Sequence, residues 1–228
     1  MQTQKHHAVI FDVDGLIINT EELYWKTFNK TLGDYGFSLT RREYSVCVGH
    51  PVEDNCRYAV DRYRLETSPG AFCKIWMERF ERAISDPEKI ALMPGFLDLL
   101  AHVRRKPYRL GIASATQRPR MEKTLRNGLL SRLEGLSSLN EIFKAMLSGS
   151  DIQRPKPAPD IYLLTAERLG VSPRTCLAFE DSEAGVRSAK AAGMDVIAVP
   201  NLFTAHQDHS AADAVLAHLM DAVVEGHV

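Results

Sequence analysis

Two aspartates close an apolar run near the beginning of the chain. Asp12 and Asp14 follow the segment AVIF, and Gly15 comes directly after them. On an extended backbone, side chains two residues apart point to the same side, so both carboxylates face one site. Carboxylates placed in this way can act as a nucleophile, exchange a proton or hold a cation. A strand-ending turn is the alternative. A calcium loop is excluded, because its sixth and twelfth positions are Ile17 and Leu23 rather than Gly and Glu.

A second acidic pair, Glu180 and Asp181, follows another apolar run. If that run forms a strand beside the first, four carboxylates meet. Two like charges ~4 Å apart repel by about 4 kcal/mol at an effective dielectric constant of about 20, so the cluster needs a cation. Oxygen ligands without His or Cys favour Mg²⁺ over zinc, and Mg²⁺ commonly shares its coordination shell with a substrate phosphate.

Lys156 and Ser114 complete this hypothesis. Four carboxylates, Mg²⁺ and the Lys156 ammonium together come close to neutral, and a phosphoryl group would be held by the metal, the ammonium and the Ser114 hydroxyl. Each residue also has an ordinary interpretation: Ser114 can end a strand, Lys156 can be a solvated loop charge, and Glu180 to Ser182 can cap a helix. Taken jointly, they favour a phosphate and Mg²⁺ site.

Short strands alternating with helices would position these residues. Apolar runs predict strands within 7–15, 108–115, 144–151, 175–182 and 194–201, and helical patterns cover 159–170 and 182–193. The pattern predicts an α/β fold with a doubly wound, Rossmann-like parallel sheet, in which ligands bind at the carboxyl ends of the strands. The polar clusters all lie at those ends.

Helical periodicity without strand runs dominates the segment 17–92. We expect this segment to form an α-helical cap domain inserted into a catalytic core that comprises 1–16 and 93–228. Trp25, Trp76 and Phe80 are expected to belong to the core of the cap. The segment that contains His206 and His209 is expected to be a surface loop, because no third ligand for a metal lies near them.

Four segments resemble, in order, the four motifs of the haloacid dehalogenase superfamily: FDVDG (11–15), Ser114 in GIASA, Lys156 in KPAPD, and FEDSEAG (179–185). The resemblance spans nearly the whole chain, and the inserted segment resembles the helical cap of that superfamily. It implies that Asp12 is the nucleophile that forms an aspartyl-phosphate and that Asp14 is the general acid and base. It also implies phosphate binding by Ser114, Ala115 and Lys156, and Mg²⁺ binding by Asp12, Asp14 (through its backbone carbonyl), Glu180 and Asp181.

Asp14 argues against the dehalogenase branch of the superfamily, where an aromatic residue stands at this position. The chain is similar to phosphatases of the pseudouridine-5′-phosphatase and sugar- or polyol-phosphatase types, although Asn19 replaces their usual Asp. A sugar phosphomutase resembling β-phosphoglucomutase is the alternative. Tyr24 stands where the mutase carries a His, and Val52 stands where it carries its cap arginine, so hydrolysis is favoured. A non-catalytic protein that binds a phosphorylated metabolite is a third hypothesis. Substrate choice is assigned to the cap residues Gly49 and His50, with Thr20 beside the hinge.

The composition of the chain limits which classes of protein and of binding partner are expected. The 228 residues are 45% hydrophobic, enough for a packed core, and the net charge of −1 gives no general attraction to nucleic acid or to membranes. The four cysteines show no metal-ligand spacing, and a chain of this size needs no disulfide staples, so a cytoplasmic location is expected. The expected partner is a small phosphorylated metabolite, and the protein is expected to be a monomer or a weak homodimer.

Overall fold

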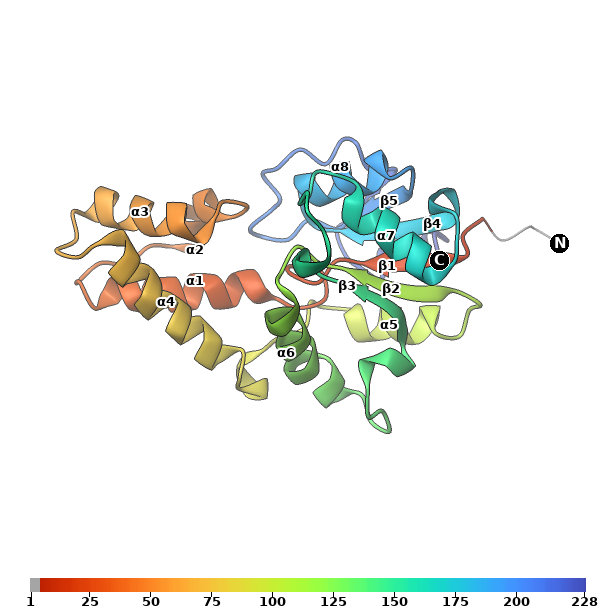
Figure 1. The fold of residues 1–228 in the computed structure, drawn as a ribbon, viewed down its shortest axis with the longest axis horizontal. Coiled ribbons are helices and arrows are strands. Elements are labelled where there is room, and N and C mark those ends of the chain that lie inside the picture. Colours follow the sequence, from red (N-terminus) through yellow and green to blue (C-terminus); the bar gives the residue numbers. More distant parts are fainter. Residues whose placement is uncertain (1–4) are drawn as a thin grey trace.

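A parallel sheet forms the centre of the computed structural model, which describes residues 5–228 (Figure 1). Its strands are β1 (Ala8–Phe11), β2 (Arg109–Ala113), β3 (Phe143–Leu147), β4 (Cys176–Glu180), β5 (Asp195–Ala198) and β6 (Ala214–Val215). They lie in the order β3-β2-β1-β4-β5-β6, and every neighbouring pair is parallel. The predicted doubly wound α/β fold is therefore confirmed. Strand β6 was not predicted, because two residues carry too little periodicity to be recognised.

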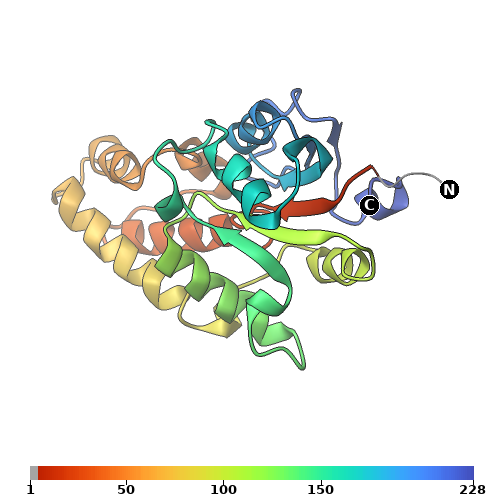
Figure 2. The ribbon, with the colours of Figure 1, turned by 45° about the vertical axis from the view of Figure 1, so that its right-hand side comes forward.

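Helices cover both faces of this sheet, as Figures 1 and 2 show. They are α5 (Phe96–Val103), α6 (Arg118–Gly128), α7 (Asp160–Leu169) and α8 (Glu183–Ala191), and α9 (Asp221–Val224) lies near the end of the chain. Alternate residues of β1 enter different cores: Val9 and Phe11 pack with α5 and α6, whereas Ala8 and Ile10 pack with α7 and α8. Burial on both faces explains why the strands are continuous apolar runs.

The chain between β1 and α5 forms a helical group at the left of Figure 1. Its helices are α1 (Thr20–Gly33), α2 (Arg41–Tyr44), α3 (Val52–Tyr63) and α4 (Pro69–Ala83). An aromatic cluster holds them together, in which the Phe28 ring meets those of Phe72 and Trp76 edge-on at centroid distances of 5.3 and 4.9 Å. Trp76 and Phe80 are buried as expected, whereas Trp25 is only partly buried, beneath the guanidinium of Arg41.

Two extended linkers connect this helical group to the sheet. The Asn19 N–H donates to the carbonyl of Ala91, and the Met93 N–H donates to the carbonyl of Ile17, so the outgoing and returning segments are hydrogen-bonded to each other. This pairing supports our proposal that 17–92 form the cap domain and that 1–16 and 93–228 form the core. Residues 1–4 of that core range lie outside the described residues. Within the part of the chain that is described, no helix is long and apolar enough to span a membrane.

The expectation that the cysteines need no pairing is wrong for two of them. Cys56 on α3 and Cys73 on α4 form a disulfide, and Cys47 and Cys176 are buried free thiols. The paired residues are 17 positions apart in the sequence, and only the packing of α3 against α4 brings them together. No spacing rule reveals such a pair.

Candidate active site

The polar residues gather where the winding of the sheet reverses, between β1 and β4. Asp12 directly follows β1, and its N–H donates to the carbonyl of Phe179 at 3.0 Å, which extends the pairing with β4. Glu180 ends β4, and Asp181 follows it. Ligands of doubly wound sheets bind in the crevice at such a reversal point. All three residues are buried, with exposed fractions of 6% or less.

Lys156 joins two of these carboxylates. Its Nζ donates to Asp12 Oδ1 and to Glu180 Oε1, each at 2.6 Å, and to the carbonyl of Ala113 at 3.0 Å. The side chain reaches the crevice from the proline-rich segment before α7 and is 6% exposed. All three donor positions of the ammonium therefore have acceptors. The predicted convergence of Lys156 with the acidic residues is present.

Oxygen atoms of Asp12, Glu180 and Asp181 lie within 4.8 Å of one another and could hold a metal ion. Among residues 5–228, this cluster contains three buried carboxylates and one contacting ammonium, so negative charge is left uncompensated. An oxygen donor set without His or Cys fits Mg²⁺. The residues therefore fit the expected cation in both charge and donor type.

The pKa values reflect this imbalance. Burial raises the pKa of Asp12 to about 7, although the Lys156 ammonium opposes the shift. Burial, followed by the charges of Asp12 and Glu180, raises the pKa of Asp181 well above its usual value. Burial alone would lower the pKa of Lys156, but its two carboxylate partners outweigh that effect and raise it above its ordinary value. A bound divalent cation would stabilise the ionised carboxylates.

Asp14 is held from the β2 side of the crevice. Its Oδ2 accepts a hydrogen bond from Thr116 Oγ1 at 2.8 Å and a longer one from Ser114 Oγ at 3.3 Å. The Ser114 Oγ in turn accepts from the Thr116 N–H. Ser114 thus lies where predicted, but its hydroxyl contacts the proposed acid and base. Thr116 was missed, because a threonine three residues after a strand resembles an ordinary turn residue.

Glu180 is more enclosed than its neighbours. Its Oε1 accepts hydrogen bonds from Lys156 and from the buried Tyr162 hydroxyl at 2.5 Å, and its Oε2 accepts from Asp181 N and Ser182 Oγ. Both oxygens are therefore occupied by protein donors. This arrangement favours contact of Glu180 with a cation through water rather than directly.

The remaining proposed phosphate-binding and specificity residues differ in their exposure and contacts. Ala115 is exposed, and its carbonyl lies so close to Gly149 that a side chain at 149 would collide with it. Gly49 has a φ of 83° in an exposed cap loop, where His50 is also exposed. Thr20 is buried, and its hydroxyl has no hydrogen-bond partner among residues 5–228. Nothing in these contacts assigns a substrate to Gly49, His50 or Thr20.

Glu21 is a cap residue that the sequence patterns did not single out. Burial, followed by the nearby charge of Asp14, raises its pKa to about 8. The carboxyl is therefore mostly protonated at neutral pH and can donate a hydrogen bond. Glu21 is thus a cap residue whose carboxyl is influenced by the charge of Asp14.

Asn201, which follows β5, was also missed. Its Nδ2 donates to Asp181 Oδ2 at 2.8 Å and to the carbonyl of Gly15 at 3.1 Å. Gly15 has a φ of 83°, and a side chain there would collide with the Asp181 carboxylate, so this approach requires glycine. The neighbouring segment is not wholly a surface loop as expected, since Phe203, Thr204 and His209 are buried.

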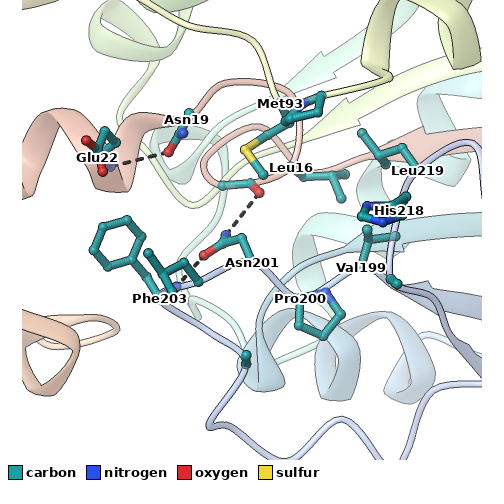
Figure 3. A pocket seen from close by; sticks show the side chains of 15 residues that line it. Leu16, Asn19, Glu22, Met93, Val199, Pro200, Asn201, Phe203, His218 and Leu219 are labelled. Atoms are coloured by element: carbon teal, nitrogen blue, oxygen red, sulfur yellow. Dashed lines mark hydrogen bonds between the residues drawn. The ribbon is translucent and has the colours of Figure 1, made fainter. Parts of the chain in front are cut away.

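A cavity of about 630 Å³ lies beside Asn201, between the linkers of the cap and the loop after β5 (Figure 3). Leu16 and Met93 line it from the linkers, and Val199 and Phe203 line it from the loop. Asp12, Asp14 and Lys156 are not among its lining residues. The cavity therefore belongs to the hinge rather than to the chemical centre.

Comparison with known proteins identifies relatives over most of the chain. Residues 9–199 match the family described as "Haloacid dehalogenase-like hydrolase". The protein CbbY of Rhodobacter capsulatus is 32% identical over 225 residues, which cover 96% of each chain. A phosphorylated carbohydrates phosphatase of Thermotoga maritima is 34% identical over 191 residues, which cover 83% of each chain.

A solved structure extends the likeness to three dimensions. The crystal structure of a CbbY mutant from Rhodobacter sphaeroides, in complex with xylulose-(1,5)bisphosphate, is 31% identical. It superimposes with a TM-score of 0.71, and the match covers 93% of this chain and 94% of the other. The similarity thus includes both the sheet and the helical group.

Proposed function

Because this chain belongs to the haloacid dehalogenase-like hydrolase family, we propose that it is a Mg²⁺-dependent phosphatase of a small phosphorylated metabolite. The observation that carries the proposal is the buried cluster of Asp12, Glu180 and Asp181 around Lys156, with Asp14 alongside. Such a cluster would supply a nucleophile, an ammonium group that binds phosphate and a metal site within one crevice.

In the proposed first step, a carboxylate oxygen of Asp12 attacks phosphorus, and the bond between phosphorus and the ester oxygen breaks. Asp14 donates its proton to the departing oxygen, which leaves as an alcohol. Lys156 already touches Asp12 Oδ1 and would neutralise the charge that gathers on the phosphoryl oxygens, together with Ser114 and the backbone of Ala115.

In the proposed second step, water attacks the phosphorus of the aspartyl-phosphate. Asp14 removes a proton from the water, the bond from Asp12 to phosphorus breaks, and inorganic phosphate leaves. Asp12, Asp181 and the Asp14 carbonyl would hold Mg²⁺, with Glu180 contacting it through water. The cation, when bound, offsets the charges of the carboxylates and the phosphoryl group.

A phosphorylated sugar or polyol is the substrate class that we favour, with nucleoside phosphates as the next class. The phosphorylated carbohydrates phosphatase of Thermotoga maritima supports this choice, as does the CbbY complex with a sugar bisphosphate. Within this chain, the protonated carboxyl of Glu21 could donate a hydrogen bond to a substrate hydroxyl near Asp14.

The phosphomutase alternative is weakened by Tyr24, which stands at the position of the mutase histidine. The Tyr24 ring stacks on Phe80 with a centroid distance of 3.8 Å, and its hydroxyl accepts a hydrogen bond from Arg120. Tyr24 therefore packs within the cap and is hydrogen-bonded to the core helix α6. Burial raises the pKa of Tyr24 far above its ordinary value, so the phenol cannot serve as a base near neutral pH.

Phosphate release tests the proposal. A panel of sugar, polyol, nucleoside and glycolate phosphates is incubated with the protein in Mg²⁺ or in EDTA, and Asp12→Asn is the matched control. We expect release that requires Mg²⁺ and that falls by at least about 10³-fold in the variant. Wild-type activity in purified Asp12→Asn would refute the nucleophile assignment.

Two other outcomes would point to the alternatives. Conversion of one sugar phosphate into its isomer, dependent on a bisphosphate primer and with little release of phosphate, would indicate a mutase. Binding of phosphorylated metabolites at saturating Mg²⁺, without any turnover, would indicate a non-catalytic binding protein.

A further inference from the structure

The Asn201 side chain connects three parts of the molecule. Its Nδ2 donates to Asp181 Oδ2 and to the Gly15 carbonyl, and its Oδ1 accepts from the Phe203 N–H at 2.8 Å. Figure 3 shows Asn201 between Leu16 and Phe203. We propose that Asn201 is a positioning residue that orients Asp181 for the cation and, through Phe203, links cation affinity to the position of the cap. The inference rests on the proposed function.

An amide is well suited to orient this carboxylate. Both hydrogens of Nδ2 are used, so the group is fixed between Asp181 and the DxDG loop. One oxygen of Asp181 is thereby held by a neutral donor, which adds no positive charge to repel a cation, and the other oxygen stays available as a ligand. Groups that orient metal ligands in this way influence metal affinity strongly.

Phe203 carries the link to the cap. It follows β5 in the core, yet its buried ring belongs to the aromatic cluster of the cap and lies edge-on to Tyr44 at 6.2 Å. The other buried members of that cluster all lie between Phe28 and Trp76. A movement of the cap that carries Phe203 with it must therefore displace the N–H that holds Asn201.

The hinge cavity adjoins this link. It is lined by Asn201 and Phe203 on one side and by the linker residues Leu16 and Met93 on the other. Figure 3 shows these side chains around one space. The segment from Asn201 to Phe203 thus lies beside the linkers about which the cap would move. A movement of the cap would therefore shift the segment that orients Asp181.

The test measures Mg²⁺ binding to the full chain by calorimetry without substrate, and Mn²⁺ binding by electron paramagnetic resonance. The variants are Asn201→Ala and Phe203→Leu, with Leu202→Ala as the matched control, because Leu202 lies between them and is 71% exposed. We expect Asn201→Ala to weaken Mg²⁺ binding about 10- to 100-fold, Phe203→Leu to weaken it about 3-fold, and Leu202→Ala to match the wild type.

A double variant tests the link itself. If Phe203 acts through Asn201, Asn201→Ala with Phe203→Leu should bind Mg²⁺ no more weakly than Asn201→Ala alone. Additive losses would overturn the link, and unchanged Mg²⁺ binding in Asn201→Ala would overturn the positioning role. Should Asn201→Ala fail to fold, Asn201→Ser keeps a donor and should show a smaller loss; wild-type affinity in this variant would then count against the inference.

Activity separates this inference from the proposed function. If the wild type binds Mg²⁺ but releases no phosphate from any substrate, the proposed function fails while the binding data still decide the role of Asn201. In an active enzyme, Asn201→Ala should raise the Mg²⁺ concentration needed for half-maximal rate about 10-fold or more. Its kcat at saturating Mg²⁺ should stay within about 3-fold of the wild type, because Asn201 acts through Asp181.

Discussion

Thr116 Oγ1 donates a hydrogen bond to Asp14 Oδ2 at 2.8 Å, across a separation of 102 residues. The bond fixes one oxygen of the proposed acid and base toward the β2 loop. A typical intramolecular hydrogen bond contributes about 0.5–1.5 kcal/mol, enough to influence where a side chain points. Asp14 is therefore oriented by a residue outside the recognised motif.

Removing this hydroxyl should impair the chemical step. We expect Thr116→Val, which keeps the shape of the side chain, to lower kcat about 10-fold and to change KM less than about 3-fold, since Asp14 would be misoriented. Thr116→Ser keeps the hydroxyl and should retain most of the activity. Steady-state kinetics on the preferred substrate measures both parameters. Equal kcat values in Thr116→Val and the wild type would contradict the proposal that Thr116 orients Asp14.

Removing the buried ammonium should destabilise the protein. Lys156→Met leaves Asp12 and Glu180 buried without their cationic partner, which costs about 3–5 kcal/mol. Thermal unfolding should show a large fall in Tm, partly reversed by Mg²⁺, and activity should be lost. Lys26→Met removes a lysine that is 58% exposed and should leave Tm almost unchanged. A normal Tm in Lys156→Met would show that the carboxylates need no compensation.

Glu21 should affect substrate choice more than chemistry. Its pKa of about 8 leaves the carboxyl protonated near neutral pH, and it lies near Asp14. We expect Glu21→Ala to lower kcat/KM about 10-fold for a sugar phosphate but less than about 3-fold for p-nitrophenyl phosphate, which has no hydroxyl groups. Glu21→Gln keeps a hydrogen-bond donor, so its kcat/KM for the sugar phosphate should lie between those of the wild type and Glu21→Ala. An equal loss for both substrates would argue against recognition of hydroxyls.

Ion pairs between α4 and α6 should hold the cap in the position that it takes in this structure. Glu81 accepts from Arg120 Nε at 2.8 Å and from Lys123 Nζ at 3.2 Å, and these side chains are partly exposed. Glu81→Gln should raise KM about 2- to 5-fold with little change in Tm, because exposed pairs contribute little stability. Added salt should raise the wild-type KM toward that of the variant. Glu78→Gln, on the same helix, is the control and should behave as the wild type.

The bidentate contact of Arg41 with Glu22 should make the stability of the cap depend on pH. The hydrogen bond from Arg41 is the main cause of the lowered pKa of Glu22. The pair therefore contributes stability above the ordinary Glu22 pKa of 4.5 and loses it as pH falls through the lowered value. Urea unfolding should show that the wild type is more stable than Glu22→Gln at pH 7, and that this difference in the free energy of unfolding disappears once the pH falls below the lowered pKa of Glu22. If the wild type remained more stable than Glu22→Gln in acid, the stability difference would have a cause other than this ion pair.

Much of the fold could be predicted because its signals are local. The β1 run is apolar on both faces and ends in Asp12, so its place inside a parallel sheet follows from residues that are adjacent in the sequence. Helices α7 and α8 end near Gly170 and Gly193, as their patterns indicate. Strand β6 carries no such pattern, and its assignment depends on its pairing with β5.

The candidate site divides in the same way. The sequence by itself determined which residues we propose to carry chemistry. Five of them stand at strand ends or in a turn before a helix, and the resemblance to a known family orders them: Asp12, Asp14, Lys156, Glu180 and Asp181. The tertiary structure alone decided their partners. It placed Thr116 against Asp14, Asn201 against Asp181, and Cys56 against Cys73. Such contacts depend on how separate elements pack, and a distance between remote segments leaves no periodicity or spacing in either of them.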